Sequence, residues 1–342
     1  MKAAPRVSFL MAVCDGETYL DQAIQSVLSQ TFRDFEFIVI NDGSTDGTAK
    51  IIERYQRTDG RICAHEQPHL GLVGSLNRGL ELARGEYVAR MDADDISLPE
   101  RIAKQMAFMD AHQEVGICGT WIETFGNGGA VVRQYPADDA TIRSWLLFES
   151  VLAHPSIMMR RERLVRAGLS YDAGSVHAED YDLWVRAARH MVLANIPEVF
   201  LRYRLHPQQV VQKHEAEKLA SAGRVRLAQL EFLGIRPTED EFALHHALST
   251  WQFRATQDFI GASLAWLHKL KTANDVAGIY QEKVFLRVLG QRWAALCATA
   301  TPLGLWTLKT FQRTPLSVGA GLTWKQMIKF AVKCGIKRRV HG

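Results

Sequence analysis

The chain has 342 residues, of which 47% are hydrophobic and 23% charged, which excludes a disordered protein and leaves room for one large or two modest domains. Its five cysteines form no C-x-x-C pair, so neither a zinc site nor a disulfide framework is indicated, and a reducing, cytoplasmic setting is expected. The longest uncharged run, residues 293–308, is shorter than the ~20 residues that a membrane-spanning helix needs, so no span is predicted.

The net charge of +4 conceals an uneven distribution. All 37 acidic residues precede Lys283, whereas eleven of the 41 basic residues follow Glu282. Residues 1–282 therefore carry a net charge of −7 and residues 283–342 a net charge of +11. The basic tail is a separate electrostatic feature of the chain.

Strands and helices alternate over the first ninety residues. The predicted strands are short, largely apolar runs at residues 7–13, 35–40, 62–65 and 87–91. The predicted helices, whose apolar residues recur at helical spacing, are residues 20–28, a stretch through Ile51 and Tyr55, and residues 75–84 after a glycine-containing loop at 69–74. This alternation predicts an α/β protein with a parallel, doubly wound sheet.

The second part of the chain departs from this alternation. Ser97-Leu98-Pro99-Glu100 reads as a capping box that starts a helix running to about Ala111. The remaining predicted elements are a hairpin at 115–135, a short strand at 157–159, a helix beginning within 177–184, a strand at 199–205, and helices from 208 to about 290.

Three carboxylates follow the fourth predicted strand within four residues: Asp92, Asp94 and Asp95. In open α/β sheets, ligands bind in the crevice outside the carboxyl ends of the strands. Two carboxylates at positions i and i+2 can share one divalent cation, whose coordination is completed by substrate phosphates and water. Asp92-x-Asp94 therefore indicates a cation with a diphosphate, while the alternative is that these acids only cap the following helix.

Seven short motifs occur along the chain in a fixed order. They are Val7 to Val13, Ser29-Gln30-Thr31-Phe32, Ile40 to Thr48, Ala83 to Tyr87, Met91 to Asp95, His154-Pro155-Ser156 and Ala178 to Trp184. Together they resemble the family two nucleotide-sugar glycosyltransferases of GT-A fold, of the bacterial glycan-assembly type. The resemblance covers roughly residues 5–210. It implies inverting transfer of a sugar from a nucleotide-diphosphate sugar, a UDP-sugar being favoured, by a Rossmann-like, doubly wound mixed sheet with a C-terminal helical extension.

The resemblance implies a donor site at the ends of the first strands. Ala12, Cys14 and Asp42 would hold the nucleoside, with Asp42 accepting a hydrogen bond from the base, and Arg90 would lie near the phosphates. The sequence departs from the family pattern where Ala12, Cys14 and Asp15 replace the usual proline, aromatic and asparagine. The alternatives are a turn-forming role for Asp42 and an ion pair between Arg90 and a neighbouring acid.

The resemblance also implies that Asp94 binds a divalent cation, Mn²⁺ or Mg²⁺, with Asp92 on the ribose side of the same site. His154 and His206 are further candidates, because they lie in loops that approach the substrate cleft in relatives. A structural role for each histidine is the alternative.

Asp180 matches the general base of the family. Glu179 and Asp182 are competing carboxylates, and the alternative is that all three only stabilise a helix N-terminus. Polymerising, membrane-embedded relatives carry Gln-x-x-Arg-Trp, whereas Gln291-Arg292-Trp293 lacks the two intervening residues. The resemblance therefore points to addition of a single sugar.

Other classes of protein fit less well. A nucleotidyltransferase would need a glycine-rich loop with Lys or Arg after the first strand, and a dinucleotide oxidoreductase would need G-x-G-x-x-G there. Cys14-Asp15-Gly16 is neither. A non-catalytic nucleotide-sugar-binding or scaffold protein of a glycan-assembly system remains as the alternative function, although it predicts loss of an acidic site that this chain retains.

Three parts are predicted: a catalytic domain at 1–210, a helical extension at 211–290 and a basic amphipathic segment at 291–342. In the last part an apolar stripe lies beside lysines that recur every four residues; the stripe comprises Trp324, Met327, Ile328, Ala331, Val332 and Ile336. Such a helix can lie in a membrane interface with its lysines toward anionic headgroups, or pack on the catalytic domain instead. The expected partners are a nucleotide sugar, a glycan or lipid-linked acceptor and the inner face of the plasma membrane, but not nucleic acid.

Overall fold

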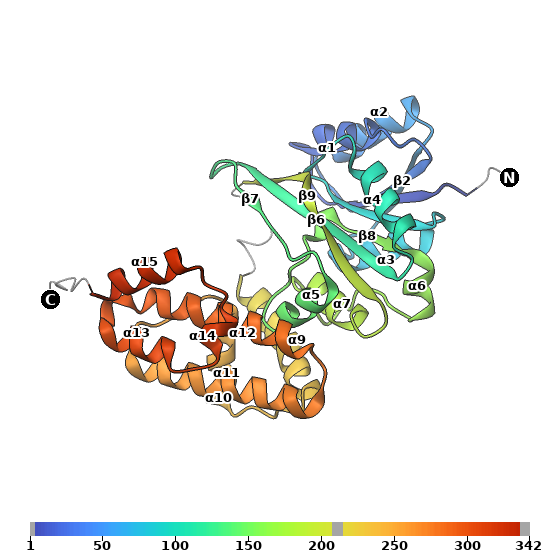
Figure 1. Ribbon diagram of the computed structural model, residues 1–342. Coiled ribbons are helices and arrows are strands. Elements are labelled where there is room, and N and C mark those ends of the chain that lie inside the picture. The colour runs from blue at the N-terminus through green and yellow to red at the C-terminus, as the bar shows by residue number, and fades with distance from the viewer. Residues whose placement is uncertain (1–3, 207–214, 336–342) are drawn as a thin grey trace. The chain divides into compact units, whose positions relative to one another are not determined.

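The computed structural model describes residues 4–206 and 215–335. The chain forms two compact units (Figure 1). The sheet unit comprises Met1–Ile142 with Ser150–Val225, and the helical unit comprises Arg143–Glu149 with Arg226–Gly342. The division at residues 210 and 290 stays a prediction, and helix α12 (Glu282–Thr299) runs through the second of these positions.

One mixed sheet forms the centre of the sheet unit. Its described strands follow the order β3-β2-β1-β4-β8-β6-β9-β5, and β7 pairs with β6 at the side. The strands are β1 (Val7–Val13), β2 (Phe35–Asp42), β3 (Ile62–Gln67), β4 (Tyr87–Asp92), β5 (Ile96–Ser97), β6 (Val115–Gly126), β7 (Val132–Arg133), β8 (Met158–Arg160) and β9 (Val192–Leu205). Strands β1 to β4 are parallel, whereas β8 is antiparallel to both β4 and β6. The predicted alternation and its later loss are both confirmed.

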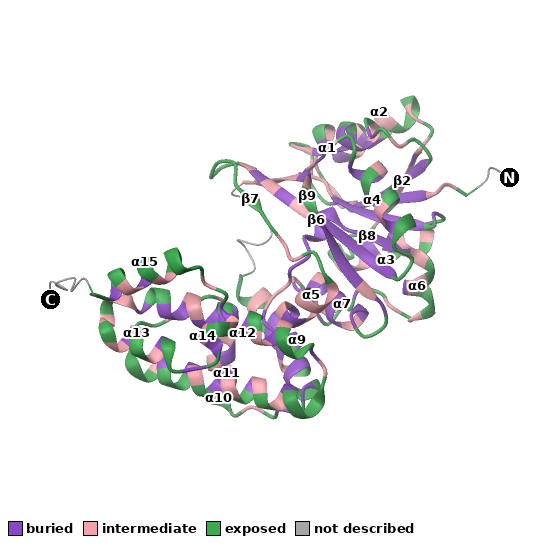
Figure 2. Cartoon of the chain, viewed as in Figure 1, coloured by how far each residue is buried: buried purple, intermediate pink, exposed green. Residues whose placement is uncertain are grey.

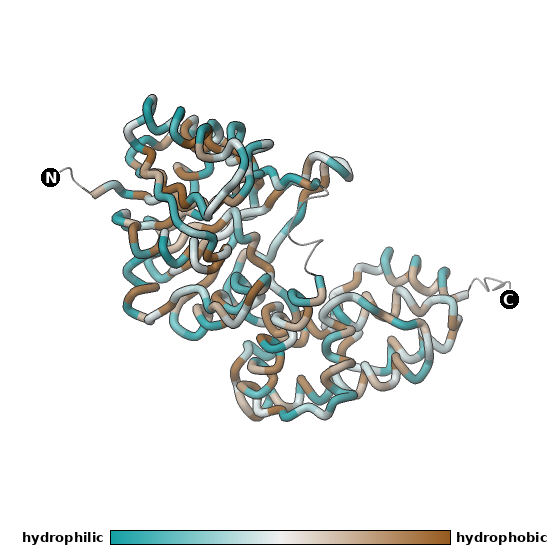
Figure 3. Tube along the Cα trace, turned by 180° about the vertical axis from the view of Figure 1, so that it is seen from behind, coloured by the Kyte–Doolittle hydropathy of each residue, from teal (hydrophilic) through white to brown (hydrophobic). Residues whose placement is uncertain are grey.

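Helices cover the sheet, and its central strands are buried (Figure 2). The helical elements of this part are α1 (Leu20–Leu28), α2 (Thr48–Thr58), α3 (Gly71–Leu82), α4 (Arg101–Ala111), α5 (Asp139–Leu146), η1 (His154–Ser156), α6 (Arg161–Arg166) and α7 (Glu179–Ala187). Figure 3 shows the same division by hydropathy, with hydrophobic stretches in the strands and hydrophilic residues along the outer helices. Burial of the apolar strands is the main stabilising contribution, at roughly 25 cal/mol per Å² of apolar surface.

Two predicted helix starts are wrong. Helix α3 begins at Gly71, four residues before Ser75, because the carboxylate of Asp42 accepts hydrogen bonds from the backbone N–H groups of Leu70 (2.8 Å) and Gly71 (2.9 Å). Ser97 does not cap α4; it belongs to β5, and α4 begins at Arg101 without a side-chain cap.

Buried polar side chains fix the loops around the end of β4. The side-chain amide of Gln30 donates to the carbonyl of Leu98 (2.8 Å), and its oxygen accepts from the N–H of Ile102 (3.1 Å). The guanidinium of Arg101 donates to the carbonyls of Arg90 (2.7 Å) and Ile157 (3.1 Å). Because a buried carbonyl without a partner is costly, these bonds hold the acidic turn and the start of β8 in one arrangement.

The helical unit has its own core, which includes the fully buried Trp293 and Phe285. Its helices are α9 (Glu215–Phe232), whose first half lies in the sheet unit, α10 (Glu239–Ser249), α11 (Gln257–Ala277), α12, η2 (Thr301–Leu303), α13 (Leu305–Gln312), α14 (Leu316–Gly319) and α15 (Trp324–Gly335). Among the described helices, none is both long and apolar enough to cross a membrane.

Candidate active site

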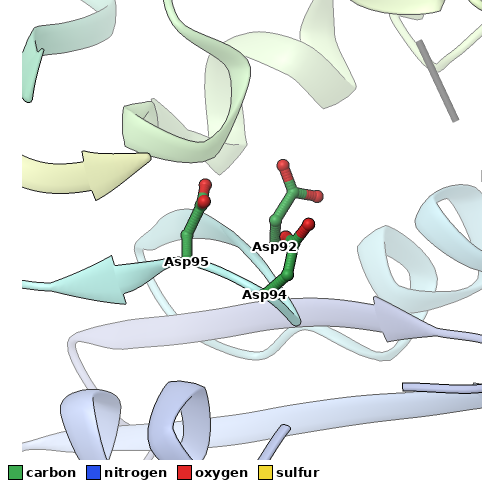
Figure 4. Close-up of side chains that lie close together, drawn as sticks. All are labelled: Asp92, Asp94 and Asp95. Carbon is green, nitrogen blue, oxygen red and sulfur yellow. The ribbon is translucent and has the colours of Figure 1, made fainter. Parts of the chain in front are cut away.

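The acidic cluster lies where β4 ends, at the centre of the sheet. Asp92 is the last residue of β4, and Asp94 and Asp95 lie in the turn that follows. One carboxylate oxygen from each of the three lies within 4.8 Å of the others. Figure 4 shows the three carboxyl groups on the same side of this turn, with those of Asp92 and Asp94 side by side. The structure thus brings together the residues that the sequence singles out.

Each carboxylate is held by a different basic residue. The buried guanidinium of Arg90 forms a fork with both oxygens of Asp92, and one of the two bonds measures 2.6 Å. The Nε2 atom of His206 lies 3.0 Å from Oδ2 of Asp94. The backbone N–H of Arg204 donates to Oδ1 of Asp95 (2.8 Å). The predicted alternative for Arg90, a pair with a neighbouring acid, is therefore what the structure contains.

Two of these contacts come from the end of β9, more than 100 residues further along the chain. Arg204 also donates through Nε to the carbonyl of Asp94 (2.7 Å), and its guanidinium lies over the ring of Tyr19 at 4.4 Å. The ring of His206 lies 4.8 Å from that of Tyr19. His206 therefore joins the acidic cluster, while Arg204 and Tyr19 were not predicted, because no motif marks either of them.

The cluster has the donor set of a site for a hard divalent cation. Oδ2 of Asp95 is buried and has no hydrogen-bond partner among residues 4–206 and 215–335. The side chains of Asp92 and Asp94 are 28% and 30% exposed, so both remain accessible to a ligand. Carboxylate oxygens suit Mn²⁺ and Mg²⁺, and the imidazole of His206 is a further donor beside Asp94. These residues therefore fit a divalent cation.

The first turn of α7 supplies a second acidic group. Glu179 is buried, and burial together with the charge of Asp180 raises the pKa of Glu179 to about 7. Burial also raises the pKa of Asp180, although the N–H of Tyr181 and the nearby charge of Lys218 oppose this rise. Asp182 is paired with Arg186.

The charges of these acids extend to the end of β4. Burial raises the pKa of Asp92 against the effect of Arg90, and the charges of Asp94 and Asp180 raise it further. Asp180 and the cation-binding carboxylates thus face a common region, with the guanidinium of Arg90 close to both. A base and a cation on opposite sides of a reacting sugar need such an arrangement.

His154 lies inside the protein beside this region. Its Nε2 atom is 2.8 Å from the hydroxyl of Tyr171, and its ring meets the edge of the buried Trp184 at 5.8 Å. Burial, with a smaller effect of Arg90, holds the pKa of His154 well below its usual value, so the imidazole is neutral. A substrate contact by His154 stays a prediction. Tyr171 was missed, because nothing in the surrounding sequence marks it.

The predicted nucleoside residues lie at the ends of β1 and β2. Ala12 pairs in register with Asp92, so the two predicted halves of the donor site are adjacent strands' ends. Although burial opposes it, hydrogen bonds from Leu70 and other donors lower the pKa of Asp42. Asp42 thus supports the start of α3 rather than a local turn.

His69 stands next to this pair without having been predicted. Its Nδ1 atom is 3.0 Å from Oδ2 of Asp42 and 3.7 Å from Sγ of Cys14, which is exposed. A separate cavity of about 400 Å³ is lined by residues of α2 and β3, and it contains none of the predicted site residues.

Comparisons with known proteins bear on this arrangement. A family model described as "Glycosyl transferase family 2" matches residues 8–168. An uncharacterized glycosyltransferase of Haemophilus influenzae is 31% identical over 243 residues, which cover 68% of this chain and 75% of that protein. The O-antigen biosynthesis glycosyltransferase WbnJ of Escherichia coli is 32% identical over 206 residues, covering 58% of this chain and 80% of that protein.

The expected GT-A fold is confirmed by solved structures. The crystal structure of S. aureus TarS 1-349 in complex with UDP resembles this chain with a TM-score of 0.55 at 18% identity, covering 95% of this chain and 89% of that one. A structure of GalNAc-T7 with UDP, GalNAc and Mn²⁺ has the same TM-score at 16% identity, covering 84% of this chain and 56% of that one. By its sequence relatives, the chain belongs to glycosyl transferase family 2.

Proposed function

We propose that the chain transfers a single sugar from a nucleotide-diphosphate sugar, with a UDP-sugar favoured, to a hydroxyl group of a glycan or lipid-linked glycan, with inversion at the anomeric carbon. The observation that carries this proposal is the convergence of Asp92 and Asp94 with Asp180 around Arg90 at the end of β4. A site that only bound a nucleotide sugar would not need a third carboxylate with a raised pKa.

Binding of the donor begins at the strand ends. Asp42 retains oxygen lone pairs besides those that cap α3, so it can accept from the imide N–H of uracil, and Ala12 leaves space beside it. The exposed ring of His69 supplies a surface near the position where family members have an aromatic residue and this chain has Cys14. The diphosphate would then lie toward Asp92 and Arg90.

Asp94 would hold the divalent cation, with Asp92 and His206 beside it. When bound, this cation neutralises the charge that develops on the departing diphosphate. Arg90 fixes the carboxylate of Asp92 in one orientation through two hydrogen bonds, so this side of the site is ordered before the donor arrives.

Asp180 would accept the proton of the acceptor hydroxyl as that oxygen attacks the anomeric carbon from the side opposite the leaving group. Its raised pKa makes it a better proton acceptor than an exposed aspartate, because base strength rises with pKa. Glu179 competes for this role, since it has a pKa of about 7. Attack from the opposite face produces inversion.

Addition of one sugar, rather than polymerisation, is supported by the place of Gln291-Arg292-Trp293. Arg292 and Trp293 are fully buried in the helical unit, where Arg292 pairs with Glu149. These residues stabilise that unit's core. The acid-free basic tail supports the further proposal that the enzyme works at the cytoplasmic face of the plasma membrane.

A panel of nucleotide sugars tests the proposal. Each sugar is incubated with the protein and Mn²⁺ or Mg²⁺ without acceptor, and slow hydrolysis is followed by release of the nucleotide. One UDP-sugar should be hydrolysed, and EDTA should stop the reaction. The control is Asp180→Asn, which should bind UDP like the wild type. Tight binding without hydrolysis or transfer to any glycan acceptor would favour the non-catalytic alternative.

A further inference from the structure

Helix α15 is anchored in the helical unit by only one of its faces. Phe330 and Cys334 are buried in the core of that unit, and the ring of Phe330 meets Phe311 edge-on with 5.2 Å between centroids. Met327 is half-buried against the same core. The predicted apolar stripe is therefore divided, because part of it packs inside the protein; Ile336 lies outside the described residues.

The other part of the stripe faces water. Trp324, Ile328 and Val332 are 68%, 54% and 53% exposed, and they recur every four residues, so they form one row along the helix. Figure 2 accordingly shows much of α15 as exposed. Single exposed apolar residues are common on proteins, but an aligned row of three on one helix is a feature of interaction surfaces.

A row of lysines runs beside the apolar row. Lys325, Lys329 and Lys333 are exposed and also recur every four residues. At 3.6 residues per turn, the apolar row falls between the buried face and the lysine row, and both exposed rows point away from the core. None of the three lysines forms a salt bridge within the described part of the chain, and no Asp or Glu follows Glu282.

We propose that the docking face of α15, defined as Trp324, Ile328 and Val332 with Lys325, Lys329 and Lys333, binds an anionic lipid surface. Tryptophan at a helix end suits the boundary between headgroups and acyl chains, short apolar side chains enter that boundary, and lysines pair with anionic headgroups. This binding does not depend on the reaction proposed above.

Charge selects this occupant over a second copy of the chain. Two copies joined through this face would bring two tails together, each with a net charge of +11, and like charges across an interface oppose association. Nucleic-acid surfaces usually place aromatic residues among the basic ones for stacking, whereas Trp324 lies on the apolar row.

Vesicle flotation with the full-length protein tests the proposal. The probes are vesicles of phosphatidylcholine with and without 30–40% phosphatidylglycerol, a range of about one anionic lipid in three. The wild type should float with the anionic vesicles at low salt and not with the neutral ones. Because each lysine near an anionic surface strengthens binding about fivefold, the triple variant Lys325→Gln, Lys329→Gln, Lys333→Gln should bind on the order of 100-fold more weakly.

Matched variants separate this face from net charge and surface hydrophobicity. The charge control replaces three exposed lysines elsewhere, Lys50, Lys104 and Lys283, by Gln and should bind like the wild type. The apolar variant Ile328→Ser, Val332→Ser should lose binding, whereas its control Val165→Ser, Val276→Ser should not. Equal loss in variants and controls, or no difference between anionic and neutral vesicles, would overturn the proposal. So would a wild-type dimer in light scattering that Ile328→Ser, Val332→Ser dissociates.

Discussion

The buried acid Glu179 should make the protein less stable as the pH rises. Its pKa is about 7 in the folded chain against an ordinary value of 4.5, so between these values the folded state binds more protons than the unfolded state. Stability that is present below pH 4.5 is therefore lost as the pH rises to about 7. The variant Glu179→Gln has no charge to bury and should lack this loss.

The size of the effect follows from the shift. For a single group with these two pKa values, roughly 2 kcal/mol is lost between pH 5.5 and pH 8, at 1.36 kcal/mol per pKa unit. Coupling to Asp180 divides the effect between two groups, so a difference of about 1–2 kcal/mol between variant and wild type is expected.

Urea unfolding of both proteins at several pH values, in buffer containing EDTA, measures this difference. The exposed acid Glu66 provides the control, and Glu66→Gln should run parallel to the wild type. Curves for Glu179→Gln and wild type that stay parallel within about 0.5 kcal/mol would refute the reasoning, because they would mean that Glu179 is ionised at no cost in the folded protein.

Three further outcomes are expected at the active site. Asp180→Asn should keep its affinity for UDP but lose turnover by a factor on the order of 10²–10⁴; full activity in Asp180→Asn with a dead Glu179→Gln would reassign the base. Asp94→Asn should lose the Mn²⁺-dependent part of UDP binding in calorimetric titrations, and equal metal dependence in both proteins would contradict the assignment. Arg90→Gln should lower the free energy of unfolding by about 3 kcal/mol, because it leaves Asp92 without its bidentate partner; Arg90→Lys, which keeps the charge but not the fork, should recover only part of that loss.

The strands were predictable because their residues carry the information locally. Val7–Val13 and Phe35–Ile40 are apolar runs bounded by turn formers, and both are strands with the expected parallel pairing. The acidic turn after β4 could be predicted for the same reason, since the strand and its carboxylates are adjacent in the sequence.

The start of α3 could not be predicted, because the group that caps it is distant. Local rules look for a capping side chain just before a helix, and Leu70 offers none. The carboxylate of Asp42, 28 residues earlier, accepts from the N–H of Leu70 instead. The same residue that the sequence marks for the nucleoside therefore also sets where α3 begins, and the helix start and the donor site share one carboxylate.

The division of α15 was also invisible to periodicity. A helical stripe shows which residues share a side, but two adjacent faces of one helix can have different neighbours. Phe330 and Cys334 contact the core, while Trp324 and Ile328 do not. The two alternatives read from the sequence, packing on the protein and exposure for docking, thus apply to different faces of the same helix.

The active site depends on parts of the chain that lie beyond the region recognised by the family model. That region ends at residue 168, after β4 and its carboxylates but before α7 and β9. Asp180 comes from α7, and Arg204 and His206 come from the end of β9, where they contact Asp95 and Asp94. A fragment ending at residue 168 would therefore keep the cation-binding carboxylates but lose the candidate base and the groups that hold the acidic turn. Since the carboxylates repel one another without those partners, the later elements are needed to order the site as well as to supply its base.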